Sequence, residues 1–441
     1  MYRIAAYSTE SFRDLLVIVM ERTPKYCIIG AGAAGLICAR HASKAAADIT
    51  VYEQTTRIGG TWVYTDSVGQ DQNGLPIHTS MYEGLRTNLP RQTMEFPDWP
   101  IVSDKSYVKQ EEVLQWLEDY ATKFNLLKLI RFEHQVIRVS PTYNKKRKWE
   151  VIVKDLKDDR YDTHLFDYVM VCNGHYSHPK IPKYPGKDIF KGLQLHSHDY
   201  RKADQFKGQD LLLVGAGYSA SDIAIATVKV AKSVTVSYHN PKKVEFDIEG
   251  SITVKPDISK LTSTGVEFVD GSQKDFSVII YCTGYNYTFP FLSVDCGIRL
   301  EENHVQPLYK HVININHPTM ALIGIPFSCI PTQVVDLQAQ LCMGYFTGEK
   351  QIPVKDEMLQ DMADDVALRR RRGLPRKWMH KMQGDFHSKY YDDLARTAGI
   401  QPIRPVVMAL FDESMRRRTK DVLRYREDNF EVINDEEFRF L

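Results

Sequence analysis

The sequence lacks the paired cysteines that zinc ribbons and dithiol redox enzymes require. Its seven cysteines are odd in number and scattered over 441 residues, and no two of them stand at C-x-x-C spacing. Such scattering, with several cysteines inside apolar runs, disfavours a disulfide framework. Neither a zinc ribbon nor a thioredoxin-type redox pair can form, so we expect no metal site and no dithiol that could accept electrons.

Long apolar runs and an excess of one charge are also absent. The longest apolar run near the N-terminus, Leu15 to Met20, is too short for a transmembrane helix and short even for a signal-peptide core. Residues 434–441 are polar in character, so we expect no membrane anchor. Basic and acidic residues nearly balance, at 57 and 56, which favours small, near-neutral partners over nucleic acid. We predict a cytoplasmic location, with secretion as the alternative, and leave a homo-oligomer open.

A glycine-rich turn separates the first apolar strand of the chain from a helical pattern. The predicted strand, turn, helix and second strand cover 25–29, 30–35, 36–47 and 49–52. In the turn, Gly30 allows the tight bend, Gly32 lets a pyrophosphate approach the helix N-terminus, and Gly35 lets the helix pack on the strand. Glu53 stands 18 residues past Gly35, where an acid accepts the ribose hydroxyls of a dinucleotide. The segment predicts a βαβ unit that binds a dinucleotide.

A second unit of the same kind follows later in the chain. Its predicted strand, turn, helix and strand cover 211–214, 215–220, 221–231 and 233–238. Gly215 and Gly217 keep the first two glycines, and Ala220 replaces the third, a variant that the dinucleotide fingerprint tolerates. We include Tyr218 and Ser219, which follow Gly217, among the expected contacts of this second dinucleotide.

The last strand of the second unit ends without an acid. The position equivalent to the acid of the first unit is Tyr238, and around it cluster Ser237, His239, Lys242 and Lys243. Such a cluster suits a 2′-phosphate better than a free ribose hydroxyl. We therefore predict NADPH rather than NADH, with a solvated basic loop as the alternative interpretation of the two lysines.

Two further apolar strands, 168–174 and 278–284, end in matching glycine turns and flank the second unit. We interpret them as the points where the chain leaves and re-enters the first domain. The predicted fold is α/β, with two dinucleotide-binding Rossmann-like domains and the NADPH domain inserted into the FAD domain. The expected divisions are an N-terminal extension, the first part of the FAD domain, the NADPH domain, and the second part of the FAD domain with C-terminal helices, at 1–23, 24–175, 176–285 and 286–441.

The C-terminal stretch from Glu349 is charged and mostly helical in pattern. Its densest basic run extends from Arg369 to Arg372, and we interpret that run as a solvated helix face.

Two dinucleotide folds without a dithiol restrict the redox chemistry. Such a chain can move a hydride from nicotinamide to flavin, and oxygen is then the remaining electron acceptor. A reduced flavin forms a C4a-hydroperoxide with O2, which transfers its distal oxygen to a substrate or decays to hydrogen peroxide. Productive transfer requires a dry site and hydrogen bonds that hold the peroxide. A flavin disulfide reductase shares both folds but requires the missing cysteine pair, whereas a non-catalytic module that senses nucleotide redox state remains an alternative.

Several segments between Tyr26 and Ala398 resemble the flavin-containing monooxygenases. Glu53 with Gly59-Gly60-Thr61-Trp62 is similar to the second flavin signature of that family, and residues 190–200 are similar to its FxGxxxHxxxF/Y fingerprint. The last fingerprint position is Tyr200, where Baeyer–Villiger enzymes usually carry tryptophan, which favours oxygenation of heteroatoms over ketones. Further similar segments are Cys282-Thr283-Gly284-Tyr285, Leu308-Tyr309-Lys310-His311 and Asp392-Asp393-Leu394-Ala395.

The resemblance implies roles for individual residues. It implies that Gly60 and Trp62 contact FAD, that Asn88 is the catalytic amide near the flavin C4a edge, and that Gln338 contacts the flavin. The arginine that usually stands beside the family serine at Ser237 is missing, so His239 and the two lysines have to replace it. We interpret His196 and His198 as hinge or packing residues, because oxygen transfer to an amine needs no protonated base.

The resemblance also suggests a substrate class. Soluble insect members of the family include enzymes that convert pyrrolizidine alkaloids to N-oxides. We therefore predict N-oxygenation of a plant tertiary amine by FAD, NADPH and O2, with thioether S-oxygenation or Baeyer–Villiger oxidation as alternatives.

Overall fold

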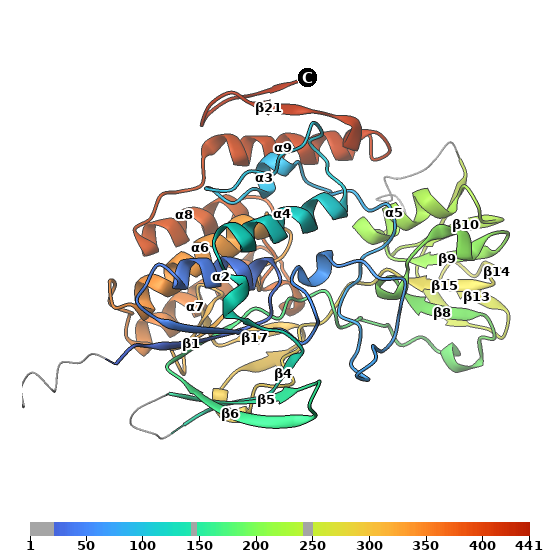
Figure 1. The fold of residues 1–441 in the computed structure, drawn as a ribbon. Helices are drawn as coiled ribbons and strands as arrows, with labels where there is room; N and C mark the ends of the chain where they lie inside the picture. The colour runs from blue at the N-terminus through green and yellow to red at the C-terminus, as the bar shows by residue number, and fades with distance from the viewer. Residues whose placement is uncertain (1–21, 143–147, 241–249) are drawn as a thin grey trace, which may run out of the picture.

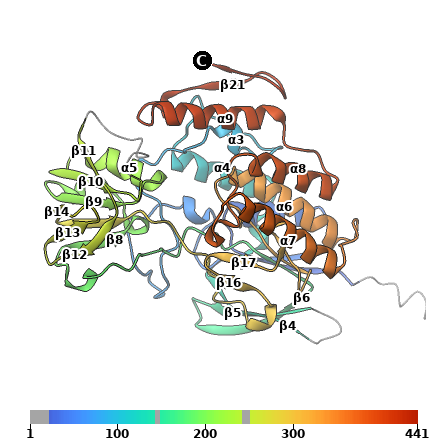
Figure 2. The ribbon, with the colours of Figure 1, turned by 180° about the vertical axis from the view of Figure 1, so that it is seen from behind.

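The computed structural model describes residues 22–142, 148–240 and 250–441. The chain forms a larger and a smaller lobe, each built around its own sheet, and helices cover the larger lobe (Figure 1). The chain passes into the smaller lobe after residue 171 and returns after residue 281. Viewed from behind, the C-terminal helix extends along one side of the larger lobe and ends near the smaller lobe (Figure 2). No described helix combines the length and apolar character needed to cross a bilayer.

The sheet of the larger lobe has the strand order β18-β19-β20-β7-β1-β2-β3 in the described chain. The strands β20, β7, β1, β2 and β3 run parallel to one another, whereas β18, β19 and β20 pair antiparallel. The central strand β1 is buried along most of its length. This burial explains its continuous apolar sequence. The strands are β1 (Lys25–Ile29), β2 (Asp48–Tyr52), β3 (Ile130–Arg131), β7 (Tyr168–Val171), β18 (Leu308–Tyr309), β19 (Ile313–Asn314) and β20 (Met320–Leu322).

The sheet of the smaller lobe repeats this topology. Its order, β11-β10-β9-β15-β8, places β15-β9-β10-β11 in the same relation as β7-β1-β2-β3, and all its pairs are parallel. The edge strand β8 pairs with β15 as β20 pairs with β7. The strands are β8 (Leu193–His196), β9 (Asp210–Val214), β10 (Ser233–Ser237), β11 (Ile252–Lys255) and β15 (Val278–Tyr281).

Each unit also carries an antiparallel three-stranded meander before the strand that returns beside its central strand, and we call these strands, β7 and β15, the return strands. The first consists of β4 (His134–Pro141), β5 (Trp149–Asp155) and β6 (Arg160–Phe166), and the second of β12 (Ile258–Leu261), β13 (Gly265–Phe268) and β14 (Gln273–Asp275). Two short hairpins complete the strands, namely β16 (Arg299–Glu301) with β17 (His304–Gln306), and β21 (Phe430–Val432) with β22 (Phe438–Phe440).

The helices of the larger lobe bury one continuous apolar cluster against its sheet. In the smaller lobe, α5 packs on the second sheet around a separate cluster. Helices α2 and α5 begin directly after the two glycine turns, three residues earlier than the apolar pattern predicts. The helices are α2 (Ala33–Ala42), α3 (Arg91–Met94), α4 (Gln110–Lys123), α5 (Tyr218–Thr227), α6 (Pro331–Phe346), α7 (Lys355–Arg371), α8 (Phe386–Ala398) and α9 (Pro405–Lys420).

The C-terminal region differs from the sequence-based expectation in two respects. It ends in the β21–β22 hairpin instead of continuing as helix. Arg369, which we expected on a solvated face, is 1% exposed. Its guanidinium binds Asp365 one turn earlier on α7, donates to the carbonyl of Lys381, and stacks on Phe386. A run of basic residues therefore does not have to be solvated throughout. One of its side chains can be buried where a carboxylate pairs with it and an aromatic ring stacks on it.

Helix α2 packs closely on the turn after β1, and this packing predicts that a side chain at Gly35 destabilises the protein. A Cβ added there would lie 1.9 Å from the carbonyl oxygen of Gly30, so backbone has to move. Overpacking costs about 1–3 kcal/mol, and contact with backbone belongs at the upper end. We expect Gly35→Ala to lower the free energy of unfolding in urea by about 3 kcal/mol.

The matched control is Gly217→Ala, because φ at Gly217 is −83° and nothing lies within 4 Å of an added Cβ. Equal stability losses in both variants would contradict the packing argument.

Candidate active site

The first glycine turn is shaped by contacts that leave no room for side chains. Gly30 has φ of +102°, and an added Cβ would lie 2.7 Å from the carbonyl oxygen of Cys172, at the end of β7. Glu53 is 8% exposed, and its carboxylate accepts hydrogen bonds from the backbone N–H of Ala31 at 2.8 Å and of Thr55 at 2.9 Å. The acid therefore closes the turn and lies beside the N-terminus of α2.

A glycine pair, Gly59 and Gly60, packs directly on the first glycine turn. The backbone N–H of Gly59 donates to the carbonyl of Ala31 at 3.1 Å, and a Cβ added at Gly60 would lie 3.1 Å from the Cα of Gly32. Gly32 is the N-cap of α2 and no side chain caps that helix. The first N–H groups of α2 thus face a cradle of backbone, as an approaching pyrophosphate requires. Trp62 follows in a short 3₁₀ helix, η1 (Gly60–Trp62), and packs at the edge of the main cluster.

The second glycine turn, which contains Gly215 and Gly217 in the smaller lobe, has the same geometry as the first. Gly215 has φ of +110°, and its added Cβ would lie 2.5 Å from the carbonyl oxygen of Cys282, at the end of β15. Gly217 caps α5 without a side-chain cap and opens onto free space. Tyr218 is 42% exposed, and Ser219 is partly exposed beside it. The N-terminus of α5 is therefore accessible to an anionic ligand.

The structure describes two of the four residues expected around a 2′-phosphate. Ser237 is 1% exposed at the end of β10, and its hydroxyl donates to the carbonyl of Pro256 at 2.7 Å. His239 is exposed, and its ring lies against that of Tyr238. Lys242 and Lys243 lie outside the described residues.

Asn88 lies in a bend just before α3. It is partly buried, and its side-chain amide makes no hydrogen bond to any described residue. The neighbouring backbone is fixed, because the N–H of Thr87 donates to the carbonyl of Val108 at 2.8 Å. An amide with free donors and acceptor on a fixed backbone is available to a ligand.

Gln338 lies on α6 and is fully buried. Its oxygen accepts from the backbone N–H of Gly324 at 2.8 Å, and its amide donates to the hydroxyl of Tyr390 at 2.7 Å. Both ends of the amide are therefore used within the protein, and the side chain fixes the turn at Gly324.

The fingerprint segment 190–200 packs the edge strand β8 against the return strand β15. Phe190, His196 and Tyr200 are all buried, and the ring of His196 contacts Tyr285 edge-on at 5.1 Å between centroids. His198 is buried as well, and its Nδ1 lies 2.9 Å from the carboxylate of Asp199. The Nε2 of His198 also lies 3.4 Å from the carbonyl oxygen of His78, so His198 packs against the larger lobe.

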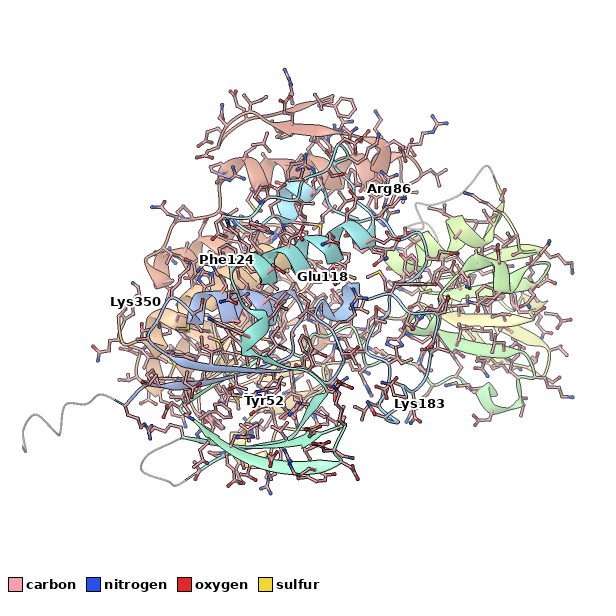
Figure 3. All side chains as sticks on the ribbon, viewed as in Figure 1. Tyr52, Arg86, Glu118, Phe124, Lys183 and Lys350 are labelled. Atoms are coloured by element: carbon pink, nitrogen blue, oxygen red, sulfur yellow. The ribbon has the colours of Figure 1, made fainter. Side chains whose placement is uncertain are left out.

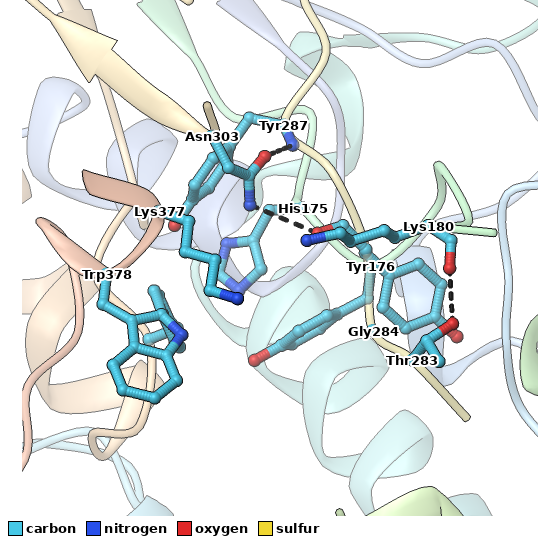
Figure 4. Close-up of a pocket in the computed structure, with 11 residues that line it drawn as sticks. His175, Tyr176, Lys180, Thr283, Gly284, Tyr287, Asn303, Lys377 and Trp378 are labelled. Carbon is cyan, nitrogen blue, oxygen red and sulfur yellow. Dashed lines mark hydrogen bonds between the residues drawn. The ribbon is translucent and has the colours of Figure 1, made fainter. Parts of the chain in front are cut away.

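The chain passes between the lobes at two glycine turns, Gly174 and Gly284, which we call the crossover turns. A cavity of about 230 Å³ lies where they meet (Figure 4). The rings of Tyr176, Tyr285, Tyr287, Phe327 and Trp378 line it, together with the ammonium groups of Lys180 and Lys377. His175 lies in the cavity wall, where its Nδ1 bonds the carbonyl of Gly324 at 2.8 Å and its buried Nε2 has no described partner. The lining contains no carboxylate.

Lys180 and Lys377 are absent from the sequence-based expectation. They reach the cavity from separate segments, one after the first crossover turn and one in the C-terminal region, and neither stands in a recognisable motif. His175 and Tyr285 directly follow the matching glycine turns, and this position was the feature of the sequence that could have identified them as cavity residues. Among the described residues, no group of His, Cys, Asp or Glu is arranged to hold a metal ion.

The profile of the Flavin-binding monooxygenase-like family matches residues 23–245 and 241–416. The chain belongs to this family. Senecionine N-oxygenase of Tyria jacobaeae is 32% identical over 423 residues, which cover 94% of this chain and 91% of that protein. Flavin-containing monooxygenase FMO GS-OX5 of Arabidopsis thaliana is 35% identical over 394 residues, 85% of each chain. The solved structure of S-allyl-L-cysteine S-oxygenase from Allium sativum has a TM-score of 0.85 and 32% identity, covering 92% of this chain and 95% of that one.

Membership of the Flavin-binding monooxygenase-like family identifies the chain as a monooxygenase that uses FAD and NADPH. The α/β fold with two dinucleotide units agrees with this assignment and confirms the predicted fold class. The two backbone cradles, each at the N-terminus of a helix without a side-chain cap, fit two dinucleotide pyrophosphates.

Burial of the site histidines predicts how stability depends on pH. Burial lowers the pKa of His175 and of His196 to about 4, from a usual value near 6.5. The unfolded chain therefore binds more protons than the folded chain between about pH 6.5 and 4, and stability falls as the pH drops through that window. We expect a loss of about 2 kcal/mol per histidine at pH 5 relative to pH 7.5.

The measurement is urea unfolding at pH 7.5 and pH 5. In His175→Asn the amide can still donate to the carbonyl of Gly324. The loss of stability between pH 7.5 and pH 5 should be smaller in this variant by about 2 kcal/mol, the contribution of one histidine. An unchanged pH dependence in this variant would contradict a neutral, buried His175.

Proposed function

We propose that the protein transfers one oxygen atom from O2 to the nitrogen of a neutral tertiary amine, such as a plant alkaloid. The observation that carries this proposal is the cavity at the crossover turns, which combines aromatic walls and two lysines with a lining free of carboxylates. A protonated amine meets two like charges and no carboxylate there, whereas the free base, the form that attacks oxygen, avoids this repulsion. The likeness to senecionine N-oxygenase supports the same reaction.

We propose that the first glycine turn holds FAD. Gly30, Gly32 and Gly35 shape the backbone around the pyrophosphate, and Glu53 accepts the ribose hydroxyls beside its bond to Ala31. Gly60 and Trp62 border the same cradle. The bound flavin supplies the activated oxygen, and the protein contributes binding, orientation and exclusion of water.

We propose that the second glycine turn holds NADPH. Gly215 and Gly217 admit the pyrophosphate, and Tyr218 and Ser219 border it at the start of α5. The proposed contacts of the 2′-phosphate are Ser237, His239, Lys242 and Lys243. To bind the phosphate, Ser237 has to turn its hydroxyl proton away from the carbonyl of Pro256, which accepts it here.

Asn88 is the proposed catalytic amide, because its donors and acceptor are free while its backbone is held. Gln338 acts indirectly on the cavity. Its oxygen accepts a hydrogen bond from the N–H of Gly324, and the carbonyl of Gly324 is in turn bonded to the Nδ1 of His175. No general base is needed at the cavity, since a free amine attacks with its own lone pair and burial keeps His175 neutral at pH 7.

Oxygenation of an anionic thioether is the second candidate function. Lys180 and Lys377 offer two positive charges to a carboxylate or sulfate on the substrate, and the aromatic rings receive an apolar thioether body. The structural likeness to S-allyl-L-cysteine S-oxygenase, whose named substrate is an amino-acid thioether, supports this candidate.

The Asn88 amide predicts a specific uncoupling. In Asn88→Ser, flavin reduction by NADPH should stay within about threefold of the wild type, because the variant changes one neutral hydrogen bond. Substrate oxygenation should fall at least tenfold, and the consumed NADPH should appear as hydrogen peroxide. Stopped-flow reduction and a peroxide assay measure both quantities, and full coupling in the variant would remove Asn88 from the site.

A pH-rate comparison decides between the two candidate substrates. For a tertiary amine, kcat/KM should rise with pH through the pKa of the amine, whereas a thioether should show no such rise. Lys377→Gln should raise the KM of an anionic thioether roughly three- to tenfold, since the lost contact is charge-assisted but solvent-exposed, and should leave a neutral amine unchanged.

The control is Lys183→Gln, an exposed lysine between the lobes that does not line the cavity (Figure 3). Turnover of neither amines nor thioethers, with ketones oxidised instead, would refute both candidates.

A further inference from the structure

The C-terminal segment 405–440, which we call the C-terminal strap, contacts both dinucleotide units. The strap comprises α9, the 3₁₀ helix η9 (Tyr425–Glu427) and the β21–β22 hairpin. It lies along the larger lobe, and the end of α9 reaches α5 of the smaller lobe (Figure 1). There the hydroxyl of Tyr218 meets the sulfur of Met415 at 3.5 Å, and the guanidinium of Arg418 lies 4.2 Å above the Tyr218 ring.

Arg426, in η9, forms a bidentate ion pair with Asp222 of α5. Its Nη1 and Nη2 each donate to one carboxylate oxygen of Asp222 at 2.9 Å, and the two side chains are 16% and 13% exposed. The hydroxyl of Tyr82 donates to the same carboxylate at 2.7 Å. The nearby Asp222 raises the pKa of Arg426 above its usual value despite burial. Fork geometry and shielding from water place this pair among the stronger ion pairs.

The same guanidinium also binds the segment that carries Asn88. The Nε of Arg426 donates to the carbonyl of Thr87, the residue before Asn88, at 3.0 Å. Arg86 reaches back from the other side, where it donates to the carbonyl of Arg426 and pairs with Glu427 at 2.6 Å. Arg86 lies between the lobes near the strap (Figure 3).

The hairpin of the strap fixes the remainder of this segment. The backbone N–H of Phe430 donates to the hydroxyl of Ser106 at 2.9 Å, and the amide of Gln92 donates to the carbonyl of Phe430 at 2.6 Å. The segment around Asn88 is thus fastened at both ends to the strap. Through Arg426 the strap is fastened to α5, the helix that follows the glycine turn of the second dinucleotide unit.

We propose that Arg426 is a positioning residue that sets the distance and angle between the second dinucleotide unit and the segment of the larger lobe that carries Asn88. This inference rests on the proposed binding of FAD and NADPH to the two units. Hydride transfer needs the two reacting rings within van der Waals contact, and a shift of 1 Å costs large factors in rate. Arg426 touches neither proposed cradle, so it acts on the reaction through α5 and through Thr87.

The test compares Arg426→Gln, Asp222→Asn and the double variant in the FAD-loaded protein. We expect each single variant to slow flavin reduction by NADPH at least tenfold and to raise peroxide release. Calorimetry should show the Kd of NADP⁺ within threefold of the wild type, because the contacts at α5 itself remain. The double variant should be no slower than the singles, since all three break one pair.

Hydrogen exchange supplies a readout that does not depend on activity. Residues 82–88 and 218–227 should both exchange faster in Arg426→Gln. The control is Arg416→Gln, whose 61% exposed side chain pairs with Glu413 within α9, and it should change neither exchange nor reduction. If Arg426→Gln fails to fold, Arg426→Lys replaces it, because lysine keeps the charge but cannot bind Asp222 in a fork and Thr87 at once.

Two results would overturn the positioning role. One is normal flavin reduction in both single variants, and the other is slow reduction that follows a proportional loss of NADP⁺ affinity. A wild-type protein that NADPH does not reduce would instead refute the proposed function. Faster exchange confined to residues 82–88 and 218–227 in Arg426→Gln would still show that Arg426 holds these two segments.

Discussion

The structure depends on the close approach of backbone to backbone at two glycine turns. The carbonyls of Cys172 and Cys282, at the ends of the two return strands, lie where a side chain on Gly30 or Gly215 would be. Each return strand can therefore pair with its central strand up to the last residue, with the N–H of each cysteine bonded to the strand beside it. This pairing leads both crossover segments past the glycine turns and creates the cavity between the lobes.

The two units share one topology, which explains how they can face each other. In each, the central strand, the helix, two further strands and a meander lead to a return strand beside the first. Dinucleotides bind at the carboxyl ends of such strands, so two linked units bring two binding edges to the same junction. The C-terminal strap crosses this junction, and its contacts to α5 and to Thr87 join the two lobes.

The parts of the fold that short stretches of sequence encode were predictable. Both glycine turns, Glu53 and the return strands follow from patterns of a few residues, because each turn requires glycine at specific positions. The meanders and the C-terminal hairpin were not identified, since short antiparallel strands leave little periodicity. The pair of Arg426 and Asp222 joins residues 204 apart, and nothing in either local sequence indicates the other. Arg369 illustrates the same limit, because the burial of its side chain depends on the ring of Phe386 from another helix.

We infer that the turn at Gly30 and Gly32 holds FAD and that the turn at Gly215 and Gly217 holds NADPH, independently of each other. The most direct measurement compares Gly32→Val with Gly217→Val for flavin content after purification and for NADP⁺ binding by calorimetry. Gly32→Val should lose flavin, because its methyl groups would fill the cradle in front of Gly60. Gly217→Val should retain flavin and lose NADP⁺ affinity at least tenfold. Flavin retained at the wild-type level in Gly32→Val, or lost in Gly217→Val, would contradict the assignment.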